Sequence, residues 1–374
     1  MPRSASIALA GLAALAVAMG IGRFAFTPIL PMMQEQGLSL AAGSWLASAN
    51  YAGYLAGALF AGAGLRPGLA MRAGLLAIGV VTFAMGLTSS LAAWLVLRFT
   101  AGVASAWVLV HVSAWCLARL AALGALRLDG VLFAGVGVGS AAAGLLCAAL
   151  MRGGGNAGHA WFSLGALSLA LTAALWPALD EASETPARRA GRERFAWTPE
   201  ALRLVACYGA YGFGYIIPAT FVPAMAKALV PDPRVFGWAW PIFGLTAAAS
   251  TLLAARLRGR VSDRQVWRWS IAAMALGVAS PVLFAGALGI VLAAALVGGT
   301  FVVVTMAAMQ EARRLAGEHA APLMAALTAA FALGQVVGPL SVPLLVAHGG
   351  FAAALLLAAA LLALSALLLP RERR

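Results

Sequence analysis

The sequence predicts an all-α, polytopic membrane protein of about twelve transmembrane helices, arranged as two pseudo-symmetric six-helix bundles. The first observation is composition: 63% of the residues are hydrophobic and 10% are charged, whereas a soluble domain carries about 25% charged residues. The second is that apolar stretches of about 20 residues, long enough to cross a hydrocarbon core of about 30 Å, recur from end to end. The third is that basic residues gather in alternate loops. A soluble fold is excluded because it needs a charged exterior.

The predicted spans follow one another with short connections that are polar or contain Gly and Pro. The first apolar stretch is too long for the core of a signal peptide, and no cleavage site follows it, so we expect it to be kept as the first helix. No stretch between the spans resembles a separate soluble domain. The predicted spans are 5–30, 43–65, 69–89, 91–118, 130–150, 159–179, 201–227, 236–256, 268–287, 289–310, 322–346 and 349–369.

The distribution of Lys and Arg predicts the orientation of these spans. With the N-terminus placed inside, Arg152, Lys227 and Arg234 fall in outer loops, and Arg23 and Arg98 lie within spans. The other 20 of the 25 basic residues fall on the inner side. Because bacterial membranes hold basic residues on the cytoplasmic side, we expect an inner-membrane protein with both termini in the cytoplasm. The net charge of +13 is then a topology signal, aided by membrane lipid, and we expect no nucleic-acid partner.

The longest hydrophilic stretch divides the chain into two halves of six spans each. This stretch, 180–200, carries several arginines among acidic residues and is predicted to be a cytoplasmic linker between an N-terminal bundle, 1–179, and a C-terminal bundle, 201–374. Segments 20–33 and 212–225 share two glycines, a proline and a methionine at an offset of 192 residues. Similar helices opening two six-span halves are the expected trace of duplication in a transporter.

Glycines and prolines in the spans predict close packing and bending. Gly135 and Gly139 belong to a run that we expect to place small residues along one side of the fifth span, and Gly334, Gly338 and Pro339 hold a comparable place in the eleventh. Gly allows helices to approach closely and Pro removes a backbone bond, so such helices can bend during alternating access. The alternative is tight packing without movement.

Several motifs resemble those of the major facilitator superfamily. The fourth span carries Arg98-Phe-Thr-Ala-Gly102, similar to an Arg-x-x-x-Gly motif of that superfamily, and the glycine-rich fifth span resembles its next signature. The loop 259–264 is similar to its cytoplasmic loop motif, and the resemblance implies that Asp263 and Arg264, with the glycines of the fifth span, form a conformational gate. The corresponding first-half loop, 64–67, lacks the acidic residue and departs from the motif.

The opening segment carries a narrower resemblance. Segments 20–28 (Gly-Ile-Gly-Arg-Phe-Ala-Phe-Thr-Pro) and 50–54 (Asn-Tyr-Ala-Gly-Tyr) resemble the YbfB/YjiJ family of bacterial transporters. The resemblance implies the fold of the superfamily, an inner-membrane location and transport by alternating access, and it implies no particular substrate.

Two arginines within spans are the principal candidates for substrate binding. Arg23 and Arg98 both fall roughly 9 Å outward of the midplane at 1.5 Å per residue, and Glu35 and Asp129, the acids closest in sequence, fall in loops. Because a buried charge requires a partner, two unpaired cations beside a cavity predict a site for an anion such as a carboxylate. The structural alternative is that the arginines bind helix-end carbonyls or snorkel outward.

Neutral polar side chains complete the predicted substrate site. Tyrosines at i, i+3 and i+7 share one face of the seventh span, and Asn50 and Tyr54 share a face of the second. Each of these groups could instead line a helix interface, and Asn50 could form a bond between packed helices. The candidates besides the arginines are Asn50, Tyr54, Tyr208, Tyr211, Tyr215 and Gln335.

Coupling to an ion has no clear basis in the sequence. No carboxylate is deeply embedded, which leaves His111 and Glu311 as candidates for proton coupling. The alternatives are that His111 is a packing residue and that Glu311 pairs with Arg313 or Arg314 at the interface. Facilitated diffusion or exchange of one anion for another fits this absence as well as proton symport or antiport does.

The sequence favours a carrier over other classes of membrane protein. A membrane enzyme needs clustered acids, histidines or metal ligands, but the four histidines are scattered and the three cysteines lack ligand spacing, so we expect no catalytic residues, metal or cofactor. A non-transporting sensor would need a large soluble domain or long tail. We therefore expect a functional monomer that moves a small organic solute with an anionic, carboxylate-like group; the alternative is a broad-specificity exporter of metabolites or drugs.

Overall fold

The computed structural model is helical throughout the part of the chain that it describes. The first predicted span consists of α1 (Arg3–Leu15), a π-helical segment η1 (Ala16–Ile21) and α2 (Phe26–Glu35). The other helices are α3 (Leu40–Phe60), α4 (Pro67–Met85), α5 (Leu91–Ala122), α6 (Asp129–Arg152), α7 (Ala157–Asp180), α8 (Pro199–Leu229), α10 (Ala239–Leu257), α11 (Asp263–Leu283), α12 (Ala287–Ala316) and α13 (Ala320–Leu368), with a short 3₁₀ turn η2 (Leu126–Leu128). The described residues are 3–61, 67–180, 196–229, 232, 236–257, 260–317 and 320–370.

These helices provide the twelve predicted spans. Nine helical segments of the described residues are long and apolar enough to cross a membrane. α3, with 21 residues, and α10, with 19 residues, are similar in length and add two more. α13 contains two spans, because Gly349 and Gly350 leave the helical conformation and Gly350 adopts a positive φ of 65°, which favours glycine. The predicted boundary between spans eleven and twelve falls at this break.

Some helices begin earlier than hydropathy predicts. α11 begins at Asp263 rather than at 268, because the side chain of Ser262 accepts a hydrogen bond from the backbone N–H of Gln265 (3.3 Å) and caps the helix. The polar first turn is helical but lies outside the apolar stretch from which the span was predicted.

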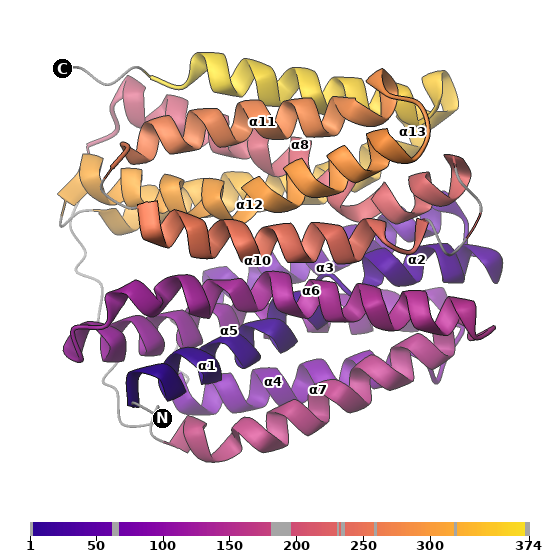
Figure 1. Ribbon diagram of the computed structural model, residues 1–374, viewed down its shortest axis with the longest axis horizontal. Helices are drawn as coiled ribbons and strands as arrows, with labels where there is room; N and C mark the ends of the chain where they lie inside the picture. Colours follow the sequence, from indigo (N-terminus) through magenta and orange to yellow (C-terminus); the bar gives the residue numbers. More distant parts are fainter. Residues whose placement is uncertain are drawn as a thin grey trace.

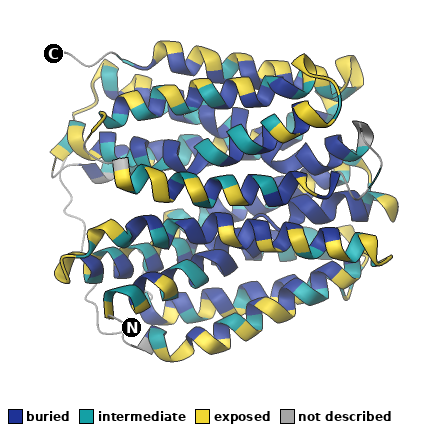
Figure 2. Cartoon of the chain, viewed as in Figure 1, coloured by how far each residue is buried: buried dark blue, intermediate teal, exposed yellow. Residues whose placement is uncertain are grey.

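The helices run roughly side by side along the long axis of the molecule, as Figure 1 shows. Helices α1 to α7 form one group, and helices α8 to α13 form a second group above it in this view. α1 begins and α13 ends at the same end of the bundle, called here the terminal end; the opposite end is the far end. Figure 2 shows buried residues between the helices and exposed residues on their outer faces, many of which are large and apolar, as expected of a lipid-facing surface.

The internal repeat is visible in contacts between equivalent positions. Thr27 Oγ1 donates a hydrogen bond to the carbonyl of Ala219 (2.9 Å), and Lys227 pairs with Glu35 (2.5 Å). Each pair is separated by 192 residues, the offset of the repeat. Residues related by a two-fold repeat meet one another on the axis that relates the copies. The contact between α2 and α8 therefore lies on the pseudo-two-fold axis.

The glycines of α6 occupy two sides of the helix rather than the single side predicted. A Cβ on Gly139 would lie 2.3 Å from the carbonyl oxygen of Ala16 in η1, so this side packs within the first group. A Cβ on Gly137 would lie 2.4 Å from the carbonyl oxygen of Gly244 in α10, so this side packs against the second group. The single-sided prediction was wrong because residues two apart point in nearly opposite directions at about 100° per residue.

The first part of α13 packs against α8 as α6 packs against the first span. A Cβ on Gly334 would lie 2.5 Å from the carbonyl oxygen of Gly209, and one on Gly212 would lie 2.3 Å from that of Phe331. These backbone contacts place the eleventh span where the comparison with the fifth predicted it.

Candidate substrate site

The candidate site is built on a break in the first span. Pro28 lacks an N–H, and its ring crowds the carbonyl four residues earlier, so the helix cannot continue regularly through residues 22–25. The N–H of Gly22 reaches back five residues to the carbonyl of Val17 (2.9 Å), and the N–H of Thr27 binds the carbonyl of Phe24 (3.1 Å) instead of that of Arg23. The irregular backbone needs side-chain donors in a region without water.

Side chains of α5 and α3 supply those donors. Arg98 donates from Nη1 to the carbonyl of Gly22 (3.3 Å) and from Nη2 to that of Arg23 (3.0 Å). Ser105, two turns along α5, donates to the carbonyl of Ala18 (2.7 Å). Asn50 donates to the carbonyls of Gly22 (3.4 Å) and Arg98 (2.9 Å). Arg98 therefore binds backbone carbonyls and Asn50 joins packed helices, as the structural alternatives proposed. Contact of either side chain with substrate stays a prediction.

Arg23 extends from the same turn toward the second helix group. Its Nη2 donates to Oε1 of Gln335 in α13 (2.5 Å), and Nε2 of Gln335 donates to the hydroxyl of Tyr215 in α8 (2.6 Å). The Arg23 side chain is 2% exposed and that of Gln335 is 0% exposed. Nε of Arg23 has no hydrogen-bond partner within the described chain. Gln335 is therefore buried between Arg23 and Tyr215, and its contact with substrate stays a prediction.

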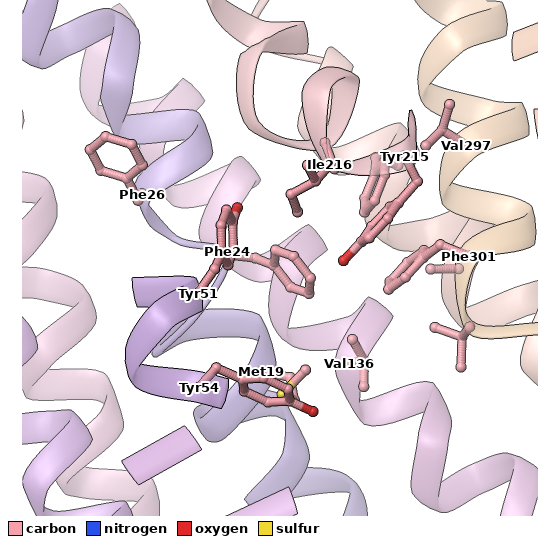
Figure 3. Close-up of a cluster of buried hydrophobic side chains, with 14 of the residues drawn as sticks. Met19, Phe24, Phe26, Tyr51, Tyr54, Val136, Tyr215, Ile216, Val297 and Phe301 are labelled. Carbon is pink, nitrogen blue, oxygen red and sulfur yellow. The ribbon is translucent and has the colours of Figure 1, made fainter. Parts of the chain in front are cut away.

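Aromatic rings surround the guanidinium of Arg23. Its central carbon lies 4.2 Å from the ring centroid of Tyr54 and 5.3 Å from those of Tyr51 and Phe24, distances at which ring faces stabilise a cation. Figure 3 shows Tyr54, Phe24 and Tyr215 gathered where the two helix groups meet. We call Arg23, Tyr54, Tyr215 and Gln335 the central site. In the part of the chain that is described, no carboxylate forms an ion pair with Arg23 or Arg98.

The three tyrosines of α8 share one face, as their spacing predicts. Tyr208, Tyr211 and Tyr215 all stack on Phe331, with ring centroids 5.1, 5.2 and 5.6 Å away. The hydroxyl of Tyr211 donates to the carbonyl of Phe301 (2.7 Å), so this tyrosine also joins α8 to α12. Tyr215 belongs to the central site and stacks on Tyr211 (5.1 Å), and substrate contact by Tyr208 and Tyr211 stays a prediction.

The residues proposed for proton coupling lie away from the central site. His111 lies in the half of α5 nearer the terminal end, and its Nε2 has no hydrogen-bond partner among the described residues. Glu311, 0% exposed, pairs with Arg314 (2.7 Å) as predicted, and also with Arg264. Arg264 in turn binds Glu200 (2.6 Å). The partners of Arg264 could not be found from sequence because they lie on α8 and α12, far from it along the chain.

One cavity in the described part of the chain lies away from the central site. It has a volume of about 310 Å³ and is formed by α10, α11 and α12, with Asp263, Trp269, Gly299 and Gln310 in its lining. Asp263 belongs to the predicted gate, but none of the central-site residues line this cavity. The central site itself is closed, because its four side chains are at most 7% exposed.

Side chains join the two helix groups at the far end. Beyond Arg23, the hydroxyl of Tyr51 lies 3.0 Å from that of Thr220, and Lys227 of α8 binds both Glu35 and the carbonyl of Pro31. Sequence reasoning missed the Lys227–Glu35 pair. The repeat could have revealed it, since oppositely charged residues at equivalent positions can meet on the repeat axis.

Twelve helical spans in two repeat-related groups, with a cation held at their interface, define a transporter of the major facilitator type. From residue 15 to residue 370, the sequence matches the family described as "Uncharacterised MFS-type transporter YbfB", and the chain belongs to that family. A comparison with curated proteins finds no match. The chain is thus a multi-pass membrane transporter, and its family is not one of enzymes.

Proposed function

We propose that this transporter carries a small organic anion by alternating access and that Arg23 binds the anionic group. The observation that carries this proposal is a buried cation between the two helix groups, for which the described residues provide no carboxylate partner and no hydrogen-bond partner at Nε. An ionised side chain inside a membrane costs several kcal/mol unless it is paired. The anionic group of a solute would supply the missing counter-charge.

The contacts of Gln335 indicate where this anionic group would bind. The amide oxygen of Gln335 accepts one bond from Arg23, whereas a carboxylate could accept two parallel bonds from the same guanidinium. Arg23 belongs to the first helix group, while Gln335 and Tyr215 belong to the second. A solute bound there would contact both groups, as alternating access requires.

Arg98 has a supporting role in this proposal. Its guanidinium binds the carbonyls of Gly22 and Arg23 and so fixes the turn from which Arg23 extends. The sequence led us to expect that both arginines bind one anion. We propose instead that Arg23 binds the anion and that Arg98 positions Arg23.

Orientation, organisation and coupling complete the proposal. The terminal end faces the bacterial cytoplasm, and the 20 basic residues on that side support this orientation.

The transporter consists of two bundles, 1–179 and 201–374, and acts as a monomer because the central site is complete within one chain. Most of the linker between them, 180–200, lies outside the described residues. Exchange of anions or facilitated diffusion is favoured over proton coupling, because Glu311 is held by two arginines.

Thermal unfolding of the purified protein against a panel of solutes tests this function. A ligand that binds the folded state stabilises it by RT ln(1 + [L]/Kd), about 2.7 kcal/mol at a hundred times Kd. We expect carboxylates to stabilise the wild type but not Arg23→Gln. Arg152→Gln, which removes an exposed arginine at the end of α6, is the matched control and keeps the response. Stabilisation by neutral or cationic compounds alone, unchanged in Arg23→Gln, contradicts the proposal and favours a broad exporter.

A further inference from the structure

We propose that the solute is an aromatic monocarboxylate, bound through its carboxylate to Arg23 and through its ring to the neighbouring aromatic side chains. This inference rests on the proposed function and names the class of anion. Two independent features of the central site support it: the number of charges there and the chemistry of the surrounding walls.

The charge of the site fits a solute with one negative charge. The side chains in contact with Arg23, which include Tyr51, Tyr54, Phe24 and Gln335, are all neutral. The terminal nitrogens of Arg98, the other cation nearby, are bound to backbone carbonyls. A dicarboxylate or a phosphate ester would bring a second charge that the site cannot pair, and an uncompensated buried charge is strongly unfavourable.

The walls of the site fit a flat apolar body. Phe24 contacts the guanidinium of Arg23 on one side, and its ring centroid lies 5.9 Å from that of Phe301 and 6.2 Å from that of Trp240. Tyr215 lies nearly parallel to Phe301, at 4° and 5.8 Å. A carboxylate on Arg23 would therefore place the rest of the solute among rings from both helix groups, where an aromatic ring can stack.

Two hydroxyl groups near these rings are already engaged, and the indole Nε1 of Trp240 is a buried donor without a hydrogen-bond partner among the described residues. The hydroxyl of Tyr211 binds the carbonyl of Phe301, and that of Tyr51 is paired with Thr220. A sugar acid carries several hydroxyl groups and would lose more bonds to water than the Nε1 of Trp240 could replace, which is costly in a buried site. An amino acid is disfavoured for a related reason, because no carboxylate among the described residues pairs with Arg23 or lies in the contacts of the central site to receive its ammonium group.

Equilibrium binding of benzoate to the purified protein tests the class of solute. Four relatives of benzoate test its separate properties: propionate lacks the ring, phthalate adds a second charge, benzamide lacks the charge and 4-(aminomethyl)benzoate adds an ammonium group. We expect benzoate to bind at least about tenfold more tightly than each of them, since charge-assisted bonds and ring stacking each contribute factors of this order.

Matched variants separate the ring from the charge. Phe301→Leu keeps an apolar side chain in α12 but removes the ring, and we expect it to weaken benzoate binding about three- to tenfold. Phe162→Leu removes a ring that packs on Phe83 (4.9 Å) away from the central site, and it leaves binding unchanged. Arg23→Lys keeps the charge without the planar fork and binds benzoate more weakly than the wild type but more tightly than Arg23→Gln.

The outcomes of these binding experiments test the aromatic class of the solute separately from the anion carrier on which it rests. If propionate or phthalate binds as tightly as benzoate and Arg23→Gln abolishes that binding, the anion carrier stands and the aromatic class is overturned. If benzamide binds as well as benzoate, or Arg23→Gln binds benzoate normally, both proposals are overturned. Failure of the wild type to bind benzoate at all also overturns the inference. Because the solute comparison uses the wild type, it does not depend on how well any variant folds.

Discussion

At the scale of single residues, the two buried arginines have different surroundings. Sequence alone identifies Arg23 and Arg98, because a charge inside an apolar stretch is conspicuous. Their separate roles could not be predicted, since the carbonyls that Arg98 binds lie 75 and 76 residues away along the chain. The partner of Arg23 is more remote still, at 312 residues.

This difference predicts opposite effects on stability in the absence of solute. Arg98→Gln removes the side-chain donor to the buried carbonyl of Arg23 and leaves that of Gly22 with Asn50 alone, and we expect it to lower the free energy of unfolding by about 1–3 kcal/mol. Arg23→Gln removes a buried charge that has no counter-charge in the described part of the chain, so we expect the midpoint of thermal unfolding to stay the same or rise. Thermal unfolding of both variants in detergent, with Arg152→Gln as the control, checks this. Equal losses in the two variants would show that Arg23 is structural as well.

At the scale of helices, the sequence predicts the number and type of elements better than their irregularities. Hydropathy predicts one span over 5–30, but the structure divides it into α1, η1 and α2. Pro28 and its neighbouring glycines indicate that a bend is allowed. The position of the bend depends on donors from α5 and α3, which lie far away in sequence, so local patterns could not predict it.

Glycine substitutions test the close contacts between helices. Gly139→Ala would bring a Cβ to 2.3 Å from backbone of η1, and we expect such overpacking to destabilise the protein by about 1–3 kcal/mol. Gly299→Ala is the matched control within a helix, because its Cβ would meet no atom closer than 3.8 Å. It is expected to be neutral or stabilising, since Ala favours helix by about 1 kcal/mol over Gly. Chemical or thermal unfolding of both variants measures the difference; similar effects would contradict the packing described for α6.

At the scale of the whole molecule, the class of fold follows from the sequence. The conformation of the transporter, meaning the end at which the two helix groups are joined, does not. Apolar lengths, loop charges and the repeat are properties that a single chain displays along its length. The bonds between the helix groups, such as Lys227 with Glu35, depend on which conformation the two groups adopt. The structure has these groups joined at the far end.

Alternating access predicts that the far-end contacts break during each cycle. In a protein with Glu35→Cys and Lys227→Cys, a short bifunctional thiol reagent should link the two positions, because the original side chains are 2.5 Å apart. The native cysteines are buried and should react little. We expect the linked protein to lose transport. When the reagent contains a disulfide, we expect reduction of that disulfide to restore transport. Full transport by the linked protein would show that this end does not open.

The most direct test of the central claim is uptake of radiolabelled benzoate into proteoliposomes. We expect saturable uptake by the wild type and by Arg152→Gln, and uptake at the level of protein-free vesicles by Arg23→Gln. Saturable uptake by Arg23→Gln equal to that of the wild type would contradict the assignment of Arg23 as the residue that binds the transported anion.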